Sequence, residues 1–271
     1  MIKLIEIIKY IILGIIQGFT EPLPISSSGH VFILRNIFNL GEMTDLNFEI
    51  IVNFGSLIAI LLIYFEDIKK LVVNFFKYIK NKNSQSENDF KYCLLIILGV
   101  IPIGIVGFLF KDQIESFLNS TKIIGISFLI TALFLYLVRN IKGEKDDRDL
   151  TWHDALIIGL VQVIAVIPGI SRSGSTLIAA LFCNIKRSSA LKYSFMLYIP
   201  ISIGTTLLGI KDLITMPNMH EMILPYGLSF IASLIVSFFT LKWFMDVVKK
   251  GKFIYFSIYC LVMGLLVLLF L

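Results

Sequence analysis

Two polar stretches interrupt an otherwise apolar chain, and they decide how it folds: Gln17-Gly-Phe-Thr-Glu21-Pro-Leu-Pro-Ile-Ser-Ser-Ser-Gly-His30 and Pro168-Gly-Ile-Ser-Arg-Ser-Gly-Ser-Thr176. The prolines end a helix in each stretch, because proline lacks an N–H group and clashes with the preceding turn. The serines that follow can cap the start of a new helix. We therefore expect a helical hairpin around each stretch, with arms at about 4–20 and 27–38 and at about 155–167 and 173–185.

The composition places these hairpins in a membrane. Hydrophobic residues make up 57% of the chain and charged residues only 16%, and the mean hydropathy is +0.87. Soluble domains carry roughly 45–50% apolar and about 25% charged residues, so this chain lacks the polar surface that a soluble domain needs. The net charge of +5 does not indicate nucleic acid, because the basic residues lie in short segments between apolar runs. The sequence predicts an all-α polytopic membrane protein.

The lengths of the apolar runs separate membrane-crossing helices from shorter ones. A helix arm of roughly 12 residues is only ~18 Å long, whereas the hydrocarbon layer is ~30 Å thick. The two hairpins are therefore expected to enter the membrane and return on the same side, as re-entrant hairpins. Six runs are long enough to cross: 46–65, 92–110, 121–138, 188–210, 222–241 and 253–271.

The two halves of the chain match each other when the sequence is shifted by about 145 positions. Gln17 aligns with Gln162, Ile25-Ser26 with Ile170-Ser171, and Ser28-Gly29 with Ser173-Gly174. Paired interrupted helices in two halves indicate the working site of a membrane protein. We expect one integral membrane domain over 1–271, with repeat halves at about 1–140 and 150–271. Each half has three crossings, an odd number, so the halves are expected to have inverted topology and opposed hairpins.

Most lysines and arginines fall in four segments, which predicts the orientation. These segments are 66–91, 139–154, 186–192 and 242–252. Loops rich in Lys and Arg stay on the cytoplasmic side. We expect these four segments, as loops, to face the cytoplasm and both termini to face outward.

The chemistry of the two breaks fits a phosphorylated ligand. Gln17 and Glu21 share one helix face, as do Ser27 and His30. Helix starts offer free N–H groups and a positive dipole end to an anion. Arg172 near the bilayer centre costs about 2.5–3.5 kcal/mol on insertion scales, and a phosphate held by both arms of the guanidinium is the natural compensation. We expect an anion pocket beside lipid.

These residues also carry a family resemblance. Gln17 to Glu21 matches an E/Q-x-x-x-E motif, Pro24 to His30 resembles P-x-S-S-S/T-G-H, and Pro168 to Thr176 matches P-G-x-S-R-S-x-x-T. The chain resembles, over all of its length, the bacterial undecaprenyl-diphosphatases of the bacitracin-resistance type; many members carry Glu where this chain has Gln17. The resemblance implies hydrolysis of undecaprenyl diphosphate to the monophosphate lipid carrier of cell-wall synthesis. It also implies the bacterial inner or plasma membrane, with an active site that faces outward.

On this hypothesis the catalytic residues are Glu21, Ser27, His30 and Arg172. Arg172 would clamp the phosphates, His30 would act as general base or acid, and Ser27 would attack phosphorus or orient the attacking water. Glu21 with Gln17 would hold a divalent cation, Mg²⁺ or Ca²⁺, through oxygen ligands. The residues expected to bind substrate are Ser26, Ser28, Gly169, Ser171, Ser173 and Thr176.

Two other functions share features with this sequence: lipid transport and a second type of lipid phosphatase. A transporter or flippase for an anionic isoprenoid lipid also has inverted repeats with broken helices, but binding alone does not need a His–Ser pair and a carboxylate at one tip. The other large class of membrane lipid phosphatases requires a second histidine, and no histidine occurs between 154 and 219. The partners expected are the isoprenoid diphosphate, membrane lipids and no nucleic acid. The sequence leaves open a homodimer, the isoprenoid length, the cation and the route of attack.

Overall fold

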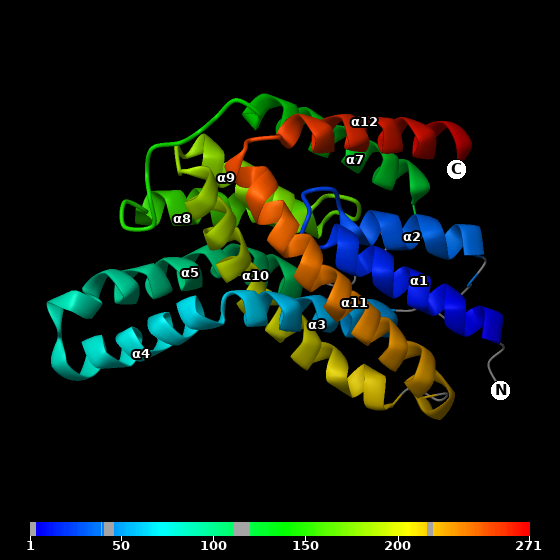
Figure 1. Cartoon of the computed structure of the whole chain (residues 1–271), viewed down its shortest axis with the longest axis horizontal. Helices are drawn as coiled ribbons and strands as arrows, with labels where there is room; N and C mark the ends of the chain where they lie inside the picture. Colours follow the sequence, from blue (N-terminus) through cyan, green and yellow to red (C-terminus); the bar gives the residue numbers. More distant parts are fainter. Residues whose placement is uncertain (1–3, 39, 41–45, 111–119, 216–218) are drawn as a thin grey trace.

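The protein is mostly helical over the residues that its computed structural model describes, which are 4–38, 40, 46–110, 120–215 and 219–271 (Figure 1). The first half contains α1 (Leu4–Thr20), α2 (Ser27–Phe38), α3 (Leu46–Ile63), α4 (Phe65–Asn81), α5 (Ser84–Leu109) and α7 (Thr121–Val138). The second half contains α8 (Trp152–Val163), η2 (Ile164–Val166), α9 (Arg172–Phe182), α10 (Arg187–Ile214), α11 (Met219–Lys249) and α12 (Phe253–Phe270).

The helical arms expected at the two breaks are present. The first hairpin is α1–α2, and α2 covers the predicted range 27–38. The second is α8–α9, whose first arm starts earlier than predicted, at Trp152. Thr151 and Asp154 form a capping box there, in which each side chain bonds the other residue's backbone N–H. The cap satisfies two N–H groups that would otherwise lack partners, so the helix begins ahead of the apolar run.

Five helices in the described part of the chain are long and apolar enough to cross a membrane: α5, α7, α10, α11 and α12. The run predicted as a crossing at 46–65 passes the same test only together with α4, and α3 and α4 are bent by 75° at their junction. The structure is therefore that of a multi-pass membrane protein.

The prediction that 66–91 is a loop is wrong. Residues Phe65–Asn81 form α4, and α5 begins at Ser84. The segment is charged but amphipathic: Leu71 is buried, and the ring of Phe75 stacks on Phe90 of α5 at 5.1 Å. Mean hydropathy hides such a pattern, because the lysines on one face cancel the apolar residues on the other.

Pairs of long helices pack closely, in places through glycine. α7 lies along α12, α1 along α11, and α8 along α5 (Figure 1). A methyl group at Gly14 would lie 2.4 Å from the carbonyl oxygen of Ser229, and one at Gly159 would lie 2.5 Å from that of Gly99. Small residues at these contacts let the backbones approach closely, as is common between membrane helices.

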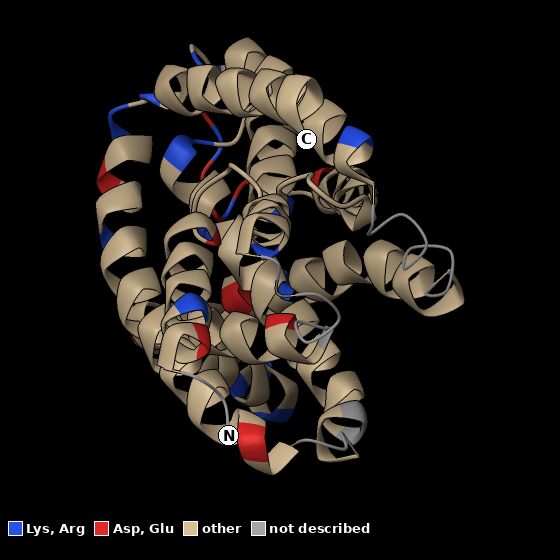
Figure 2. Cartoon of the chain, turned by 90° about the vertical axis from the view of Figure 1, so that its right-hand side faces the viewer, with Lys and Arg blue, Asp and Glu red and all other residues tan. Residues whose placement is uncertain are grey.

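The outer surface of the helices is apolar. Only 11% of the apolar window of α5 is buried inside the protein, and Phe108, Leu208 and Phe239 are among many large side chains that are exposed. Figure 2 shows long helical stretches without acidic or basic residues. Such a surface is stable when lipid covers it.

The four basic segments meet in one region of the molecule. Lys192 pairs with Asp67 at 2.7 Å and with Asp147 at 3.2 Å. The Arg187 guanidinium donates to the Ile141 carbonyl at 2.9 Å and lies 5.8 Å from the ring of Phe253, next to the segment 242–252. These contacts bring together segments that are up to about 180 positions apart in the chain.

Candidate active site

The turn of the first hairpin is built around Ser26. This residue has a left-handed backbone, with φ of 68°, which is uncommon for a residue other than glycine. The Ser26 hydroxyl accepts a hydrogen bond from the Gly29 N–H at 3.2 Å and so caps α2. The Ser26 carbonyl accepts from Nδ1 of His30 at 2.6 Å. These bonds hold the turn, and Ser27 begins the helix directly after it.

The turn of the second hairpin uses Gly169 for its left-handed residue, with φ of 85°. A methyl group there would lie 2.9 Å from Cβ of Ser127 on α7, so glycine also allows a close approach. The Ser171 hydroxyl caps α9 by accepting from the Gly174 N–H at 3.0 Å. The caps at Ser26 and Ser171 are thus alike, at positions that the internal match aligns.

The two hairpin tips contact each other. Ser171 and Ser173 donate their hydroxyls to the Leu23 carbonyl at 3.4 Å and 3.2 Å. Between the tips lies a cavity of about 80 Å³, well above the roughly 10–15 Å³ that one water needs. We call it the hairpin pocket. It is lined by Glu21, Ser26, Ser27, Ser28, Ala165, Ile170, Ser171, Arg172 and Ser173.

Glu21 is the centre of the polar groups in this pocket. One carboxylate oxygen accepts two hydrogen bonds: one comes from the Ser27 hydroxyl, and the other comes from Nε2 of Gln17 at 2.9 Å. The second oxygen lies 3.8 Å from Nη2 of Arg172. A buried carboxylate that holds a serine hydroxyl can take its proton. The structure therefore brings the carboxylate, the hydroxyl and the guanidinium predicted from the sequence to one site.

Arg172 keeps its hydrogen-bond donors free. No acceptor among the described residues takes a hydrogen bond from its guanidinium, and its only ion pair with these residues is the long one to Glu21. The central carbon of the guanidinium instead lies over the ring of Tyr198 on α10, at 5.0 Å from the centroid. Arginine has five N–H donors in a fixed fork that fits phosphate oxygens. These donors are available to an anion in the pocket.

Four residues predicted for the site do not line the pocket. His30 is turned away: its Nδ1 bonds Ser26, and its Nε2 meets the Tyr259 hydroxyl of α12 at 2.7 Å. Because the Ser26 carbonyl can only accept, Nδ1 carries the proton and Nε2 accepts from Tyr259. Thr176 bonds the Arg172 carbonyl at 3.1 Å and the Ser194 hydroxyl, so it joins α9 to α10. Gln17 reaches the pocket only through Glu21, and Gly169 shapes the turn.

The family comparison agrees with the motifs. Residues 10–266 match the family described as "Bacitracin resistance protein BacA". The chain belongs to this family. It is similar to the undecaprenyl-diphosphatase of Oceanobacillus iheyensis, with 46% identity over 98% of this chain and 97% of that protein. It is also similar to undecaprenyl-diphosphatase 1 of Bacillus licheniformis (46% identity, 97% and 98% covered) and of Halalkalibacterium halodurans (44% identity, 97% and 95% covered).

The structure also adds three side chains that the sequence motifs of the BacA family did not predict here. Tyr198 faces Arg172, and its hydroxyl donates to Oδ1 of Asn53 on α3 at 2.5 Å. Tyr259 bonds His30, and the two rings stack at 5.6 Å. All three lie within apolar runs far from either break, so no spacing relates them to the motifs. Their polarity inside those runs was the available signal.

Glu21 is the one carboxylate among the residues that line this BacA-family pocket, so a divalent cation there would need phosphate or water as its further ligands. No group of three or more His, Cys, Asp or Glu side chains suited to a metal occurs in the described ranges. Mg²⁺ is commonly held by one or two carboxylates together with substrate phosphates and water. Glu21 can supply one such carboxylate, and its oxygens face the space where a phosphate would lie.

Proposed function

We propose that this protein hydrolyses undecaprenyl diphosphate to undecaprenyl phosphate and inorganic phosphate, recycling the lipid carrier for cell-wall synthesis and giving resistance to bacitracin. Membership of the BacA family and the names of the relatives support the substrate and the reaction. The observation that carries the proposal is the grouping of Glu21, Ser27 and Arg172 around one pocket. That pocket is polar although it lies in an apolar protein, as a lipid diphosphate requires.

Glu21 is the general base of the proposed mechanism. The proton of the Ser27 hydroxyl passes to the carboxylate oxygen that already accepts its hydrogen bond. Either the serine oxygen attacks the terminal phosphorus or it orients a water that does so. The bond from that phosphorus to the bridging oxygen breaks, and undecaprenyl phosphate leaves with the bond electrons. In the serine route, water then hydrolyses the phosphoserine. Trapping phosphate on Ser27 distinguishes the two routes.

Arg172 and the helix starts take up the negative charge. The guanidinium places two N–H groups against phosphate oxygens, and Ser26, Ser28, Ser171 and Ser173 supply hydroxyls around them. Thr176 and Gly169 support the helix start and the turn instead of touching the ligand. His30 holds the Ser26 carbonyl beside Ser27, and the proposed mechanism does not use it for proton transfer, because its other ring nitrogen bonds Tyr259.

A divalent cation, Mg²⁺ or Ca²⁺, would bind with the substrate. Glu21 would be its carboxylate ligand, with Gln17 as the neighbour that orients the carboxylate. The cation would neutralise phosphate charge and polarise the phosphoryl oxygens.

The finer topology belongs to the same proposal. Six crossings and two re-entrant hairpins, related by an inverted repeat, are supported by the matching caps at Ser26 and Ser171. The pairing of α1 with α11 in space is equivalent, under the internal match, to the pairing of α8 with α5, and this equivalence also supports them. The gathering of the basic segments supports a cytoplasmic face there, with the pocket open to the outside of the plasma membrane. The homodimer stays a prediction, which the mass of the purified protein in detergent checks.

Phosphate release from the purified protein in detergent tests the function. Undecaprenyl diphosphate should yield inorganic phosphate with the wild-type chain, and Arg172→Ala should abolish the release. The rival function, lipid transport, needs no base beside a serine. Transport of labelled lipid across vesicles without any phosphate release would therefore reject hydrolysis.

A further inference from the structure

We infer that Tyr198 is a positioning residue for the reaction: its ring fixes the Arg172 guanidinium in place while leaving all of the guanidinium's N–H donors free for the diphosphate. The inference rests on the proposed function, because it assigns those donors to phosphate oxygens. Tyr198 itself does not line the hairpin pocket. It acts through Arg172.

The Arg172 guanidinium lies over the face of the Tyr198 ring. The carbon at the centre of the guanidinium lies 5.0 Å from the ring centroid of Tyr198, within the roughly 6 Å over which a cation is attracted to an aromatic face. An acidic partner would hold the guanidinium through its in-plane N–H groups and use them up. An aromatic face attracts the cation without a carboxylate or carbonyl oxygen that would occupy the N–H groups, so the donors stay open.

Tyr198 is itself held firmly. It is 3% exposed, and its hydroxyl donates to the side chain of Asn53 on α3. A ring that is fixed by two helices of the core can fix a cation in turn, whereas an exposed ring would move with it.

The alternative support for Arg172 is weaker. The ion pair to Glu21 is 3.8 Å long, and that carboxylate already accepts from Ser27 and Gln17. A proton that moves to Glu21 during the reaction would further weaken the pair. The attraction to the Tyr198 ring does not depend on that proton, so it holds Arg172 through the whole reaction.

Two substitutions separate the ring from its hydroxyl. Tyr198→Phe removes the bond to Asn53 and keeps the aromatic face, and Tyr198→Leu removes the face. We expect Tyr198→Phe to keep kcat/KM for undecaprenyl diphosphate within about threefold of wild type. We expect Tyr198→Leu to lower it roughly tenfold, which lies between the sizes of exposed and desolvated cation–π contacts. Equal values for the two variants would overturn the inference.

A double-mutant cycle with Arg172→Lys tests whether Tyr198 acts through the guanidinium. The lysine has no plane to stack on the ring, so Tyr198→Leu should cost at most about threefold in the Arg172→Lys background. The same tenfold loss in both backgrounds would show a general packing defect and reject the inference. If Tyr198→Leu does not fold, Tyr198→Met, which is also flexible and non-aromatic, takes its place in the cycle.

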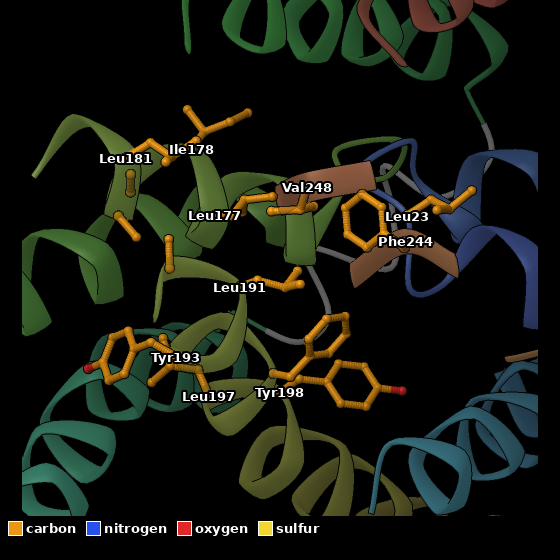
Figure 3. Packing of buried hydrophobic residues seen from close by; sticks show 14 of the residues in the cluster. Leu23, Leu177, Ile178, Leu181, Leu191, Tyr193, Leu197, Tyr198, Phe244 and Val248 are labelled. Carbon is orange, nitrogen blue, oxygen red and sulfur yellow. The ribbon is translucent and has the colours of Figure 1, made fainter. Parts of the chain in front are cut away.

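Tyr193 provides a matched control on the same helix. It is also buried, but its hydroxyl bonds the Leu95 carbonyl of α5 at 2.7 Å, and Figure 3 shows the two tyrosines pointing to opposite sides of α10. Tyr193→Leu should lower thermal stability without a tenfold fall in kcat/KM. A comparable fall would assign the effect of Tyr198→Leu to core packing and overturn the inference.

Failure of the proposed function is recognised separately. A wild-type chain that releases no phosphate would reject hydrolysis, and the cycle is then measured on binding of inorganic diphosphate, read as protection from thermal unfolding. Loss of that protection in Tyr198→Leu but not in Tyr198→Phe supports the positioning role without turnover. Equal protection in both variants rejects it.

Discussion

Replacement of Arg172 by lysine keeps the positive charge and removes the fork, so it isolates what the guanidinium contributes. No described residue takes a hydrogen bond from the guanidinium, so all of its donors can reach the substrate. A fork on a phosphate makes two charge-assisted bonds, each worth about 1.5–3 kcal/mol. Lysine can replace one of them at most. The loss of about 1.5–3 kcal/mol corresponds to a fall in kcat/KM of roughly 10- to 100-fold.

The assay is the release of inorganic phosphate from undecaprenyl diphosphate by purified protein in detergent, with kcat and KM measured separately. Because negative charge develops on the bridging oxygen of the leaving undecaprenyl phosphate as the bond breaks, the fork is worth more in the transition state, and we expect most of the loss in kcat.

The control for this substitution is Arg187→Lys. Arg187 is also an arginine at a helix start, but its guanidinium bonds backbone carbonyls of the loop after α7. Its replacement should leave kcat/KM within about twofold of wild type. An Arg172→Lys enzyme that is equally active would refute the reasoning, because a point charge would then suffice.

Three further substitutions test other parts of the structure. Glu21→Gln should lower kcat by roughly 10²–10⁴-fold, the usual contribution of a general base, and should flatten the dependence of rate on Mg²⁺; a tenfold effect or less would assign the proton to another group. His30→Ala should lower kcat while keeping the shape of the pH–rate profile, because both ring nitrogens bond outside the pocket; a changed profile near neutrality would return His30 to proton transfer. Gly14→Ala should destabilise the protein by about 1–3 kcal/mol, because its methyl group would meet the Ser229 backbone. Thermal unfolding in detergent measures this, with Gly104→Ala, which meets no atom within 4 Å, as the control that should unfold like wild type.

The sequence predicted those local features that are set by residues only a few positions away in the chain. The proline breaks, the serine caps and the start of α2 at Ser27 all depend on neighbours within a few residues. The prediction failed at 66–91, where α4 is stabilised by its contact with α5 and its charges conceal the apolar face. Averaged hydropathy cannot detect a helix of that kind.

The candidate site divides in the same way. Glu21, Ser27 and Arg172 were identified from motifs, because a carboxylate, a serine-rich helix start and an arginine are conspicuous in apolar surroundings. The orientation of His30 toward Tyr259 could not be predicted, because its partner is 229 positions away on α12. Tyr198 and Asn53 were missed for the same reason. Tyr198 contacts Arg172, and Asn53 contacts Tyr198, only because the fold packs distant helices together.

The sequence by itself determined that the chain is an apolar, helical membrane protein with two interrupted hairpins and the polar groups for an anion. Apolar length, proline and serine act within one segment, so their effects can be read along the chain. Only the tertiary structure decided which of those groups share a pocket and which serve as supports. The reason is physical: a side chain's reach is a few ångströms, and the packing of helices far apart in the chain sets which groups lie within that distance.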